Sequence, residues 1–207
     1  MPPCATISSL LSLWTALLLC SACASSNPAT KHYGPRGFWK PNRYDRNGLA
    51  KGRWRTFYDD AKQQPFTAGR YRHGRPVRTF DYYAPTGALD HSEKYGRDGL
   101  CEVTYWYFGG KVARRGAAQW VTGKGKMPRF FWYGPWTSYA EDGQTTAVQT
   151  YTNGTITRAE TYENGQLKQA EDYKEGKPSR TETYQDGKLL KVETFEKGLR
   201  TGTTRTL

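Results

Sequence analysis

The chain contains few of the residues from which catalytic and metal sites are built. It has only three histidines among 207 residues. His32, His73 and His91 are too far apart in the sequence to show the short spacing typical of metal ligands. The sequence contains no H-E-x-x-H, G-x-S-x-G or Walker A motif. We therefore expect a protein that is not an enzyme and that has no cofactor, no metal and no small-molecule substrate.

The chain also lacks a hydrophobic run of the about 20 residues that span a bilayer. Residues 7–24 are apolar or small and are typical of a signal peptide. Ser21-Ala22-Cys23 resembles a bacterial lipobox, in which the cysteine is lipidated and becomes the first residue. Ala22-Cys23-Ala24 also fits an ordinary cleavage site. We predict export and a lipid anchor on Cys23 in the bacterial envelope, at the outer membrane or cell surface. The alternative is a secreted or periplasmic protein.

Cysteine is too scarce for a disulfide framework. Cleavage before Cys23 would remove Cys4 and Cys20, and the lipid would occupy Cys23. Cys101 alone then remains, so no intramolecular disulfide is possible in the mature chain. We expect Cys101 to be a small residue inside a strand.

An 11-residue repeat begins at Tyr151 and reads YTNGTITRAET, YENGQLKQAED, YKEGKPSRTET, YQDGKLLKVET and FEKGLRTGTTR. The glycine in every unit opposes a helix, whereas Thr, Tyr and Val favour strands. Asn-Gly and Asp-Gly dipeptides are typical of two-residue type I′ hairpin turns. The repeat therefore predicts one strand and one tight turn per unit, arranged as an antiparallel meander.

A two-residue turn in each unit fixes how the predicted strands pair. It places an aromatic residue opposite an aliphatic one beside each turn: Tyr151 with Ile156, Tyr162 with Leu167, Tyr173 with Pro178, and Tyr184 with Leu189. Continued inward, this register predicts two rows of cross-strand polar pairs: Arg158, Glu171, Arg180 and Glu193; and Glu160, Gln169, Glu182 and Lys191. All the aromatic pairs then share one side of the sheet. Because the other side is polar, we expect a single-layer, twisted sheet with one face in water.

Looser copies of the repeat fill residues 48–143, where GRWRTFYDD and GPWTSYAEDG share a G-x-W pattern followed by aromatic and acidic residues. These blocks, alternating with Y-x-N/D-G-x-L units, resemble the MORN-repeat variants of bacterial proteins, some of which are grouped as YwqK-type antitoxin-like proteins. The resemblance covers roughly Asn47 to Arg200. It implies a single-layer meander of β-hairpins, and no catalytic residues can be carried over from it. The functions it implies are a scaffold, a membrane-proximal module, or an antitoxin or immunity-like protein that neutralises a cognate toxin.

These patterns together predict an all-β chain in four parts. Residues 1–22 form a signal peptide, and residues 23–45 form a flexible tether rich in Pro, Gly and polar residues. Irregular aromatic and basic MORN-like repeats occupy residues 46–143. The regular strand-turn repeats occupy residues 144–207.

Positive charge and aromatic residues concentrate in the first half. Residues 31–136 contain 21 Lys and Arg against 8 Asp and Glu, whereas residues 137–207 contain 10 against 11. Such a composition can bind nucleic acid, but the export signal argues against that. We expect an unknown partner protein (a toxin, in the antitoxin alternative) to bind here, through Trp106, Trp120, Trp132, Trp136, Arg114, Arg115 and Arg129. Two alternatives are rings that pack along one sheet face, and contact with an anionic membrane surface.

Overall fold

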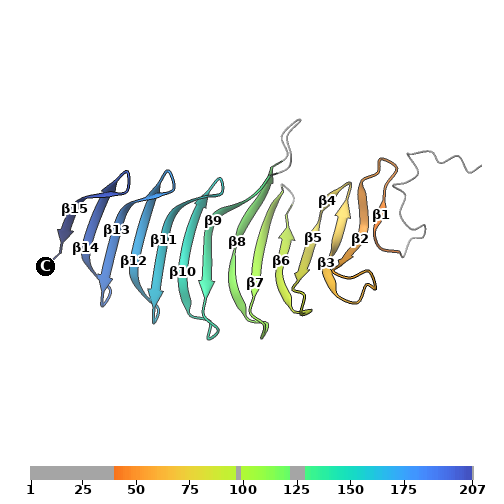
Figure 1. Ribbon diagram of the computed structural model, residues 1–207, viewed down its shortest axis with the longest axis horizontal. Coiled ribbons are helices and arrows are strands. Elements are labelled where there is room, and N and C mark those ends of the chain that lie inside the picture. The colour runs from red at the N-terminus through yellow and green to blue at the C-terminus, as the bar shows by residue number, and fades with distance from the viewer. Residues whose placement is uncertain (1–39, 97–98, 122–128, 207) are drawn as a thin grey trace, which may run out of the picture.

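The computed structural model describes residues 40–96, 99–121 and 129–206. These residues form one open antiparallel sheet of 15 strands, in which the strands follow one another in chain order (Figure 1). The predicted all-β fold, a single-layer meander of hairpins, is confirmed. The predicted signal peptide, the lipidation site Cys23 and residues 23–39 of the predicted tether lie outside the described residues.

The strands are β1 (Arg43–Tyr44), β2 (Ala50–Phe57), β3 (Pro65–Arg72), β4 (Arg75–Pro76), β5 (Arg78–Tyr83), β6 (Leu89–Tyr95), β7 (Leu100–Trp106), β8 (Val112–Val121), β9 (Arg129–Tyr139), β10 (Thr145–Thr152), β11 (Thr155–Glu163), β12 (Gln166–Lys174), β13 (Lys177–Gln185), β14 (Lys188–Glu196) and β15 (Leu199–Arg205). The short β4 pairs with β3 and lies off the main strand order. β1 falls within the range 23–45 given to the tether and pairs with β2.

The turns of the C-terminal repeat have the predicted geometry. Both turn residues have positive φ in every hairpin, from Asn153 (50°) and Gly154 (79°) to Lys197 (50°) and Gly198 (88°). Positive φ at both positions defines the type I′ turn, whose twist matches that of the flanking strands. The four aromatic–aliphatic pairs predicted beside the turns are confirmed.

The predicted inner rows are wrong, because a β-bulge follows each turn of the repeat. Beside Tyr162 the register shifts by one residue, so that no residue of β11 lies directly opposite Lys168 of β12. Arg158 consequently lies opposite Asp172 instead of Glu171, and Arg180 lies opposite Thr194 instead of Glu193. A bulge also increases the local twist of the strands. The 11-residue period is compatible with either register, so the period alone does not reveal the bulge.

The bulge turns the aromatic residues of successive units to alternate faces. A one-residue shift moves the rest of a strand to the other side of the sheet. Tyr162 and Tyr184 therefore stand on one face, whereas Tyr151, Tyr173 and Phe195 stand on the other. The expectation that all the aromatic pairs share one face is wrong for this reason.

Ion pairs between alternate residues replace a core in these repeats. Arg158 contacts Glu160 (2.8 Å) and Asp172 (2.7 Å), and the Tyr162 hydroxyl donates to Glu160 (2.8 Å). The hydrogen bond from Arg158 lowers the pKa of Glu160. Arg180 and Glu182, 2.7 Å apart, repeat the ion pair two strands later. Each C-terminal strand is thus stabilised by polar contacts with itself and its neighbours.

The buried apolar side chains of the first half lie almost entirely on one face. Phe80, Cys101, Val103, Ala118 and Trp136 are each at most 3% exposed. Their strands pair so that these residues point to the side that also carries Tyr151. We call this side the ladder face and the other side the opposite face.

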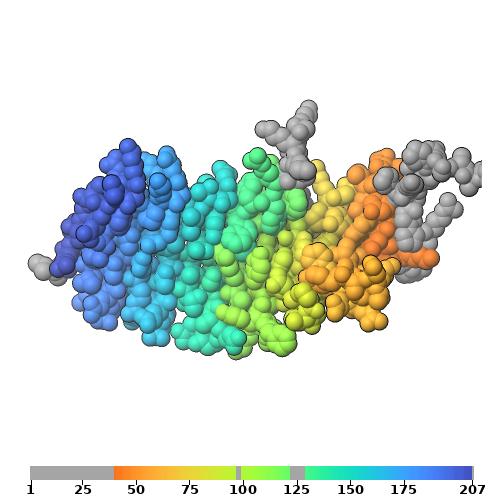
Figure 2. Space-filling model, viewed as in Figure 1, coloured from red at the N-terminus to blue at the C-terminus, as the bar shows by residue number. Residues whose placement is uncertain are grey.

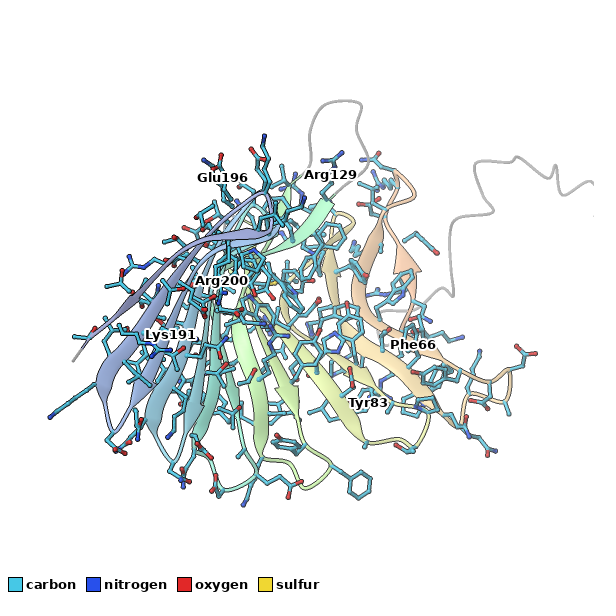
Figure 3. The ribbon with its side chains drawn as sticks, turned by 60° about the vertical axis from the view of Figure 1, so that its left-hand side comes forward. Phe66, Tyr83, Arg129, Lys191, Glu196 and Arg200 are labelled. Atoms are coloured by element: carbon cyan, nitrogen blue, oxygen red, sulfur yellow. The ribbon has the colours of Figure 1, made fainter. Side chains whose placement is uncertain are left out.

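The sheet forms an elongated body with the repeats aligned along its length (Figure 2). Side chains stand on both sides of the sheet, as Figure 3 shows. Within the described residues there is no helix long and apolar enough to cross a membrane.

Candidate functional site

A continuous series of ring contacts follows the ladder face from β1 to β10. Neighbouring ring centroids lie between 4.2 and 6.2 Å apart. We call this series the ring ladder; it contains Tyr44, Trp54, Tyr71, Phe80, Tyr82, His91, Tyr105, Trp136, Trp132 and Tyr151. Aromatic pairs at these separations contribute about 0.5–1.5 kcal/mol beyond their buried area. The ladder therefore joins strands that have no second layer to pack against.

Two glycines allow rings of the ladder to lie directly on the backbone. A Cβ atom at Gly116 would come within 2.3 Å of the Trp136 ring, and one at Gly69 within 2.0 Å of the Phe80 ring. Trp136 is 0% exposed, and its indole nitrogen donates to the Ala117 carbonyl (2.9 Å). Trp136 is thus a core residue.

Arg114 is built into the ladder. Its guanidinium carbon lies 4.4 Å from the centroid of Trp132 and 5.0 Å from that of Trp136. The same group donates to the Gln149 side chain (2.6 Å) and to the Tyr151 hydroxyl (3.3 Å). A cation held over aromatic faces in this way stabilises the packing of β8 against β9 and β10.

A buried carboxylate lies beside the ladder. Glu93 is 6% exposed and accepts hydrogen bonds from the hydroxyls of Tyr82 (3.0 Å) and Tyr95. Burial and then the nearby Glu93 charge raise the pKa of Cys101 to about 12. Cys101 is therefore an inert, neutral thiol inside the sheet, because the thiolate is the reactive form.

The candidate residues predicted from the sequence do not form a single surface. Four lie on the ladder face: Trp120, Trp132, Trp136 and Arg114. Of these, Trp120 is the most open, at 37% exposure, and its indole donates to the Tyr95 hydroxyl (3.1 Å). The other three lie on the opposite face: Trp106, Arg115 and Arg129.

The opposite face of β7–β9 presents aromatic and basic side chains together. Arg115 lies 5.6 Å above the Tyr139 ring, and Trp106 donates to the Ser92 hydroxyl (3.3 Å). Tyr133 is 50% exposed. Arg129 projects from the start of β9 (Figure 3). These side chains lie on the face away from the ring ladder and take no part in it.

A second group of cations on the opposite face was missed by the sequence analysis. Alternate residues of β2 and β3 place five exposed cations there, and we call them the basic patch: Lys51, Arg53, Arg55, Arg70 and Arg72. Arg53 and Arg70 are directly opposite each other across the two strands. The signal was available in the sequence as KGRWR and RYR, in which cations alternate with the residues of the ladder.

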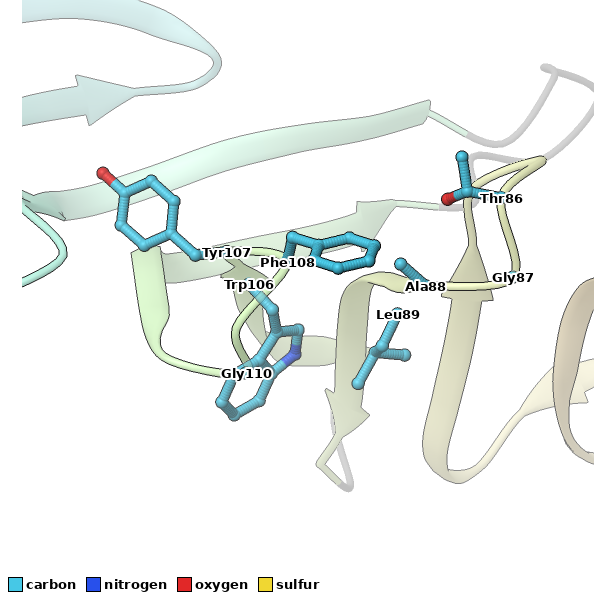
Figure 4. A pocket seen from close by; sticks show the side chains of 8 residues that line it. All are labelled: Thr86, Gly87, Ala88, Leu89, Trp106, Tyr107, Phe108 and Gly110. Carbon is cyan, nitrogen blue, oxygen red and sulfur yellow. The ribbon is translucent and has the colours of Figure 1, made fainter.

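A hollow of about 470 Å³ lies between two neighbouring hairpin turns, at the ends of the strands that they connect. It is lined by residues of the β5–β6 and β7–β8 hairpins. The Phe108 ring points from one turn toward Ala88 on the other (Figure 4), and Phe108 is 89% exposed. The hollow is open, and its lining contains no Asp, Glu, His, Cys, Lys or Arg.

Among residues 40–96, 99–121 and 129–206 there is no cluster of three or more His, Cys, Asp or Glu that could hold a metal ion. No family model and no curated protein matches the chain.

Proposed function

We propose that the protein is a non-enzymatic, envelope-anchored repeat scaffold that binds another protein. The binding surface is the opposite face of the N-terminal half, where Trp106, Arg115 and Arg129 lie. The lipid on Cys23 would hold the sheet at the membrane, and the residues up to the start of the sheet would act as its tether.

One observation carries this proposal: the two faces use their aromatic and basic residues differently. On the ladder face, Trp132, Trp136 and Arg114 contact one another and stabilise the sheet. On the opposite face, rings and cations are exposed side by side, and this composition is enriched at protein interfaces. Tyr133 illustrates the difference, because half of its surface remains in solvent.

Affinity capture from an envelope extract tests the proposal. The full-length protein, purified in a non-ionic detergent, is compared with the triple variant Trp106→Ala, Arg115→Ala and Arg129→Ala. We expect the unmodified protein to retain one stoichiometric protein at moderate salt, and the triple variant to lose it. A matched control is Lys174→Gln with Lys177→Gln, which removes charge from the C-terminal repeats.

Two results would contradict the proposal. Equal capture by the triple variant would move the binding surface elsewhere. Recovery of lipid alone, lost as salt rises, would make the molecule a membrane-contact module. If a captured protein is toxic when produced alone, the partner is a toxin and the scaffold acts as an antitoxin or immunity-like protein.

The anchor is tested separately. Cells that produce the full chain are labelled with a fatty acid, and we expect the label on the unmodified protein and none on Cys23→Ser. A labelled Cys23→Ser variant would place the lipid on another residue, and an unlabelled soluble protein cut after Ala24 would replace the anchor with simple secretion.

A further inference from the structure

We propose that the basic patch binds an extended acidic segment of the partner protein, with carboxylates on alternate residues. The protein nature of this ligand rests on the proposed function. The chemistry of the segment and its spacing come from the patch itself.

The charges of the patch are uncompensated. Arg53 lies opposite Arg70, and Arg72 lies opposite Arg75. Like charges directly opposite each other destabilise a sheet. Within the described residues, none of the five cations of the patch has a carboxylate within 4.0 Å. By contrast, Arg158, Arg180, Lys191 and Arg200 in the C-terminal repeats all form ion pairs.

The preceding part of this chain cannot supply the missing negative charge. β2 and β3 contain no Asp or Glu. The first acidic residue of the sequence is Asp45, and residues 1–39 contain none. Asp45 already accepts hydrogen bonds from the backbone of Asn47 and Leu49 and contacts His73 (3.1 Å). Asp81 of β5 shares this face with Arg55, but it accepts a hydrogen bond from Ser92 (2.8 Å) and forms no ion pair with the patch. An external anion is therefore the fitting ligand for the patch.

The spacing of the cations favours an extended peptide. Lys51, Arg53 and Arg55 are alternate residues of one strand, so their Cα atoms repeat about every 6.5–7 Å. Carboxylates on alternate residues of an extended peptide repeat at the same interval. The opposed Arg53 and Arg70, with Cα atoms about 5 Å apart, can hold one carboxylate between them by charge-assisted hydrogen bonds.

The surroundings disfavour a single-stranded nucleic acid as the ligand. Bases bind such surfaces by stacking on aromatic rings interleaved with the cations. Here Trp54 and Tyr71 alternate with the cations along the strands, but their rings stand on the ladder face, 5.4 Å apart, and pack against each other. An anionic lipid surface would recognise the charge but not the alternate spacing, and the experiment separates the two.

The test is a titration of the full-length protein with two fluorescent peptides of equal composition. One has glutamate at alternate positions with serine between (ESESESESES), and the other has its glutamates in one block (EEEEESSSSS). We expect tighter binding of the alternating peptide, weakening as salt rises. Arg53→Gln with Arg70→Gln should reduce its affinity about 10-fold. Lys174→Gln with Lys177→Gln removes a directly opposed cation pair from another part of the sheet and should leave binding unchanged.

Three outcomes would overturn the inference. Equal affinity for both peptides would show that the patch does not recognise carboxylates on alternate residues. Equal binding by the Arg53/Arg70 variant would place the site elsewhere. Binding to vesicles containing phosphatidylglycerol but to neither peptide would make the patch a lipid-contact surface. The failure of the proposed function is distinguishable, because it is decided by whether the unmodified protein captures a partner. A captured partner that the Arg53/Arg70 variant retains would exclude this patch and leave the scaffold intact.

Discussion

The two halves of the sheet are stabilised by different contacts, although both are single-layer meanders. From β1 to β10, the rings of the ladder and a few buried residues such as Val103 and Ala118 replace the missing second layer. From β11 to β15, ion pairs and polar triads take over: Arg158, Glu160 and Tyr162 form one triad on the opposite face, and Gln169, Glu171 and Tyr173 form another on the ladder face. The comparison shows that an open sheet can be held together by one aromatic face or by repeated ion pairs. In the first half the ring ladder occupies one face only.

Removal of a ladder ring should have the largest effect on stability. Trp136→Ala deletes a fully buried side chain and leaves a cavity over Gly116. We expect a loss of about 3–5 kcal/mol, the cost of removing a large buried aromatic residue. Hydrogen exchange should show lost protection in β7–β10 and smaller changes in β13–β15, because each repeat contacts only its neighbours. Equal loss throughout the sheet would show that the halves unfold as one unit.

Acid should destabilise the C-terminal repeats before the first half, the reverse of the order expected for Trp136→Ala. Hydrogen bonds from Arg158 lower the pKa of Glu160, and those from Lys191 and Arg200 lower the pKa of Glu193. A carboxyl whose folded pKa is depressed contributes stability above its unfolded pKa of about 4.3. That contribution is lost as pH falls through the folded value.

Hydrogen exchange between pH 6 and pH 3, corrected for the intrinsic exchange rate, measures this effect. The amides of β11–β15 should lose protection before those of β7–β9. Gln in place of Glu160 and Glu193 should flatten the pH dependence of the C-terminal strands. If the ladder strands open first, the ion pairs are not what stabilises the repeats.

Loss of a single arginine of the repeats should have a smaller effect. Arg158→Gln removes contacts with Glu160 and Asp172 while keeping a similar side-chain volume. We expect a loss of about 1 kcal/mol, since the network is partly exposed and surface ion pairs contribute little individually. Denaturant unfolding at low and high salt measures it. The difference between variant and unmodified protein should shrink at high salt, and a salt-independent difference would indicate lost packing instead of lost charge.

The turns of the repeat could be predicted from the sequence, but the face of the sheet on which each side chain lies could not. The Asn-Gly and Asp-Gly dipeptides determine the turn geometry, so Tyr162 and Leu167 were placed correctly from local chemistry. The bulge at Lys168 leaves the turn unchanged. Strand pairing counted outward from the turn therefore cannot predict it. Its consequence is that Tyr162 and Tyr184 stand on the opposite face, away from Tyr151 and Tyr173. Trp132 and Arg114 were candidates for binding because composition cannot show that they contact each other.

The smallest predicted effect has the opposite sign. In the first half, Arg53→Gln with Arg70→Gln removes two opposed like charges from a pair of strands that contain no Asp or Glu. We expect a gain in stability of roughly 0.2–1 kcal/mol, the range for a cross-strand pair, and a gain that disappears at high salt. Thermal unfolding of the full-length protein measures it, with Lys174→Gln and Lys177→Gln as the comparison in the second half. A gain would show that the two arginines cost stability, as the proposed binding surface predicts. A loss of stability in the Arg53/Arg70 variant would instead mean that these arginines support the sheet.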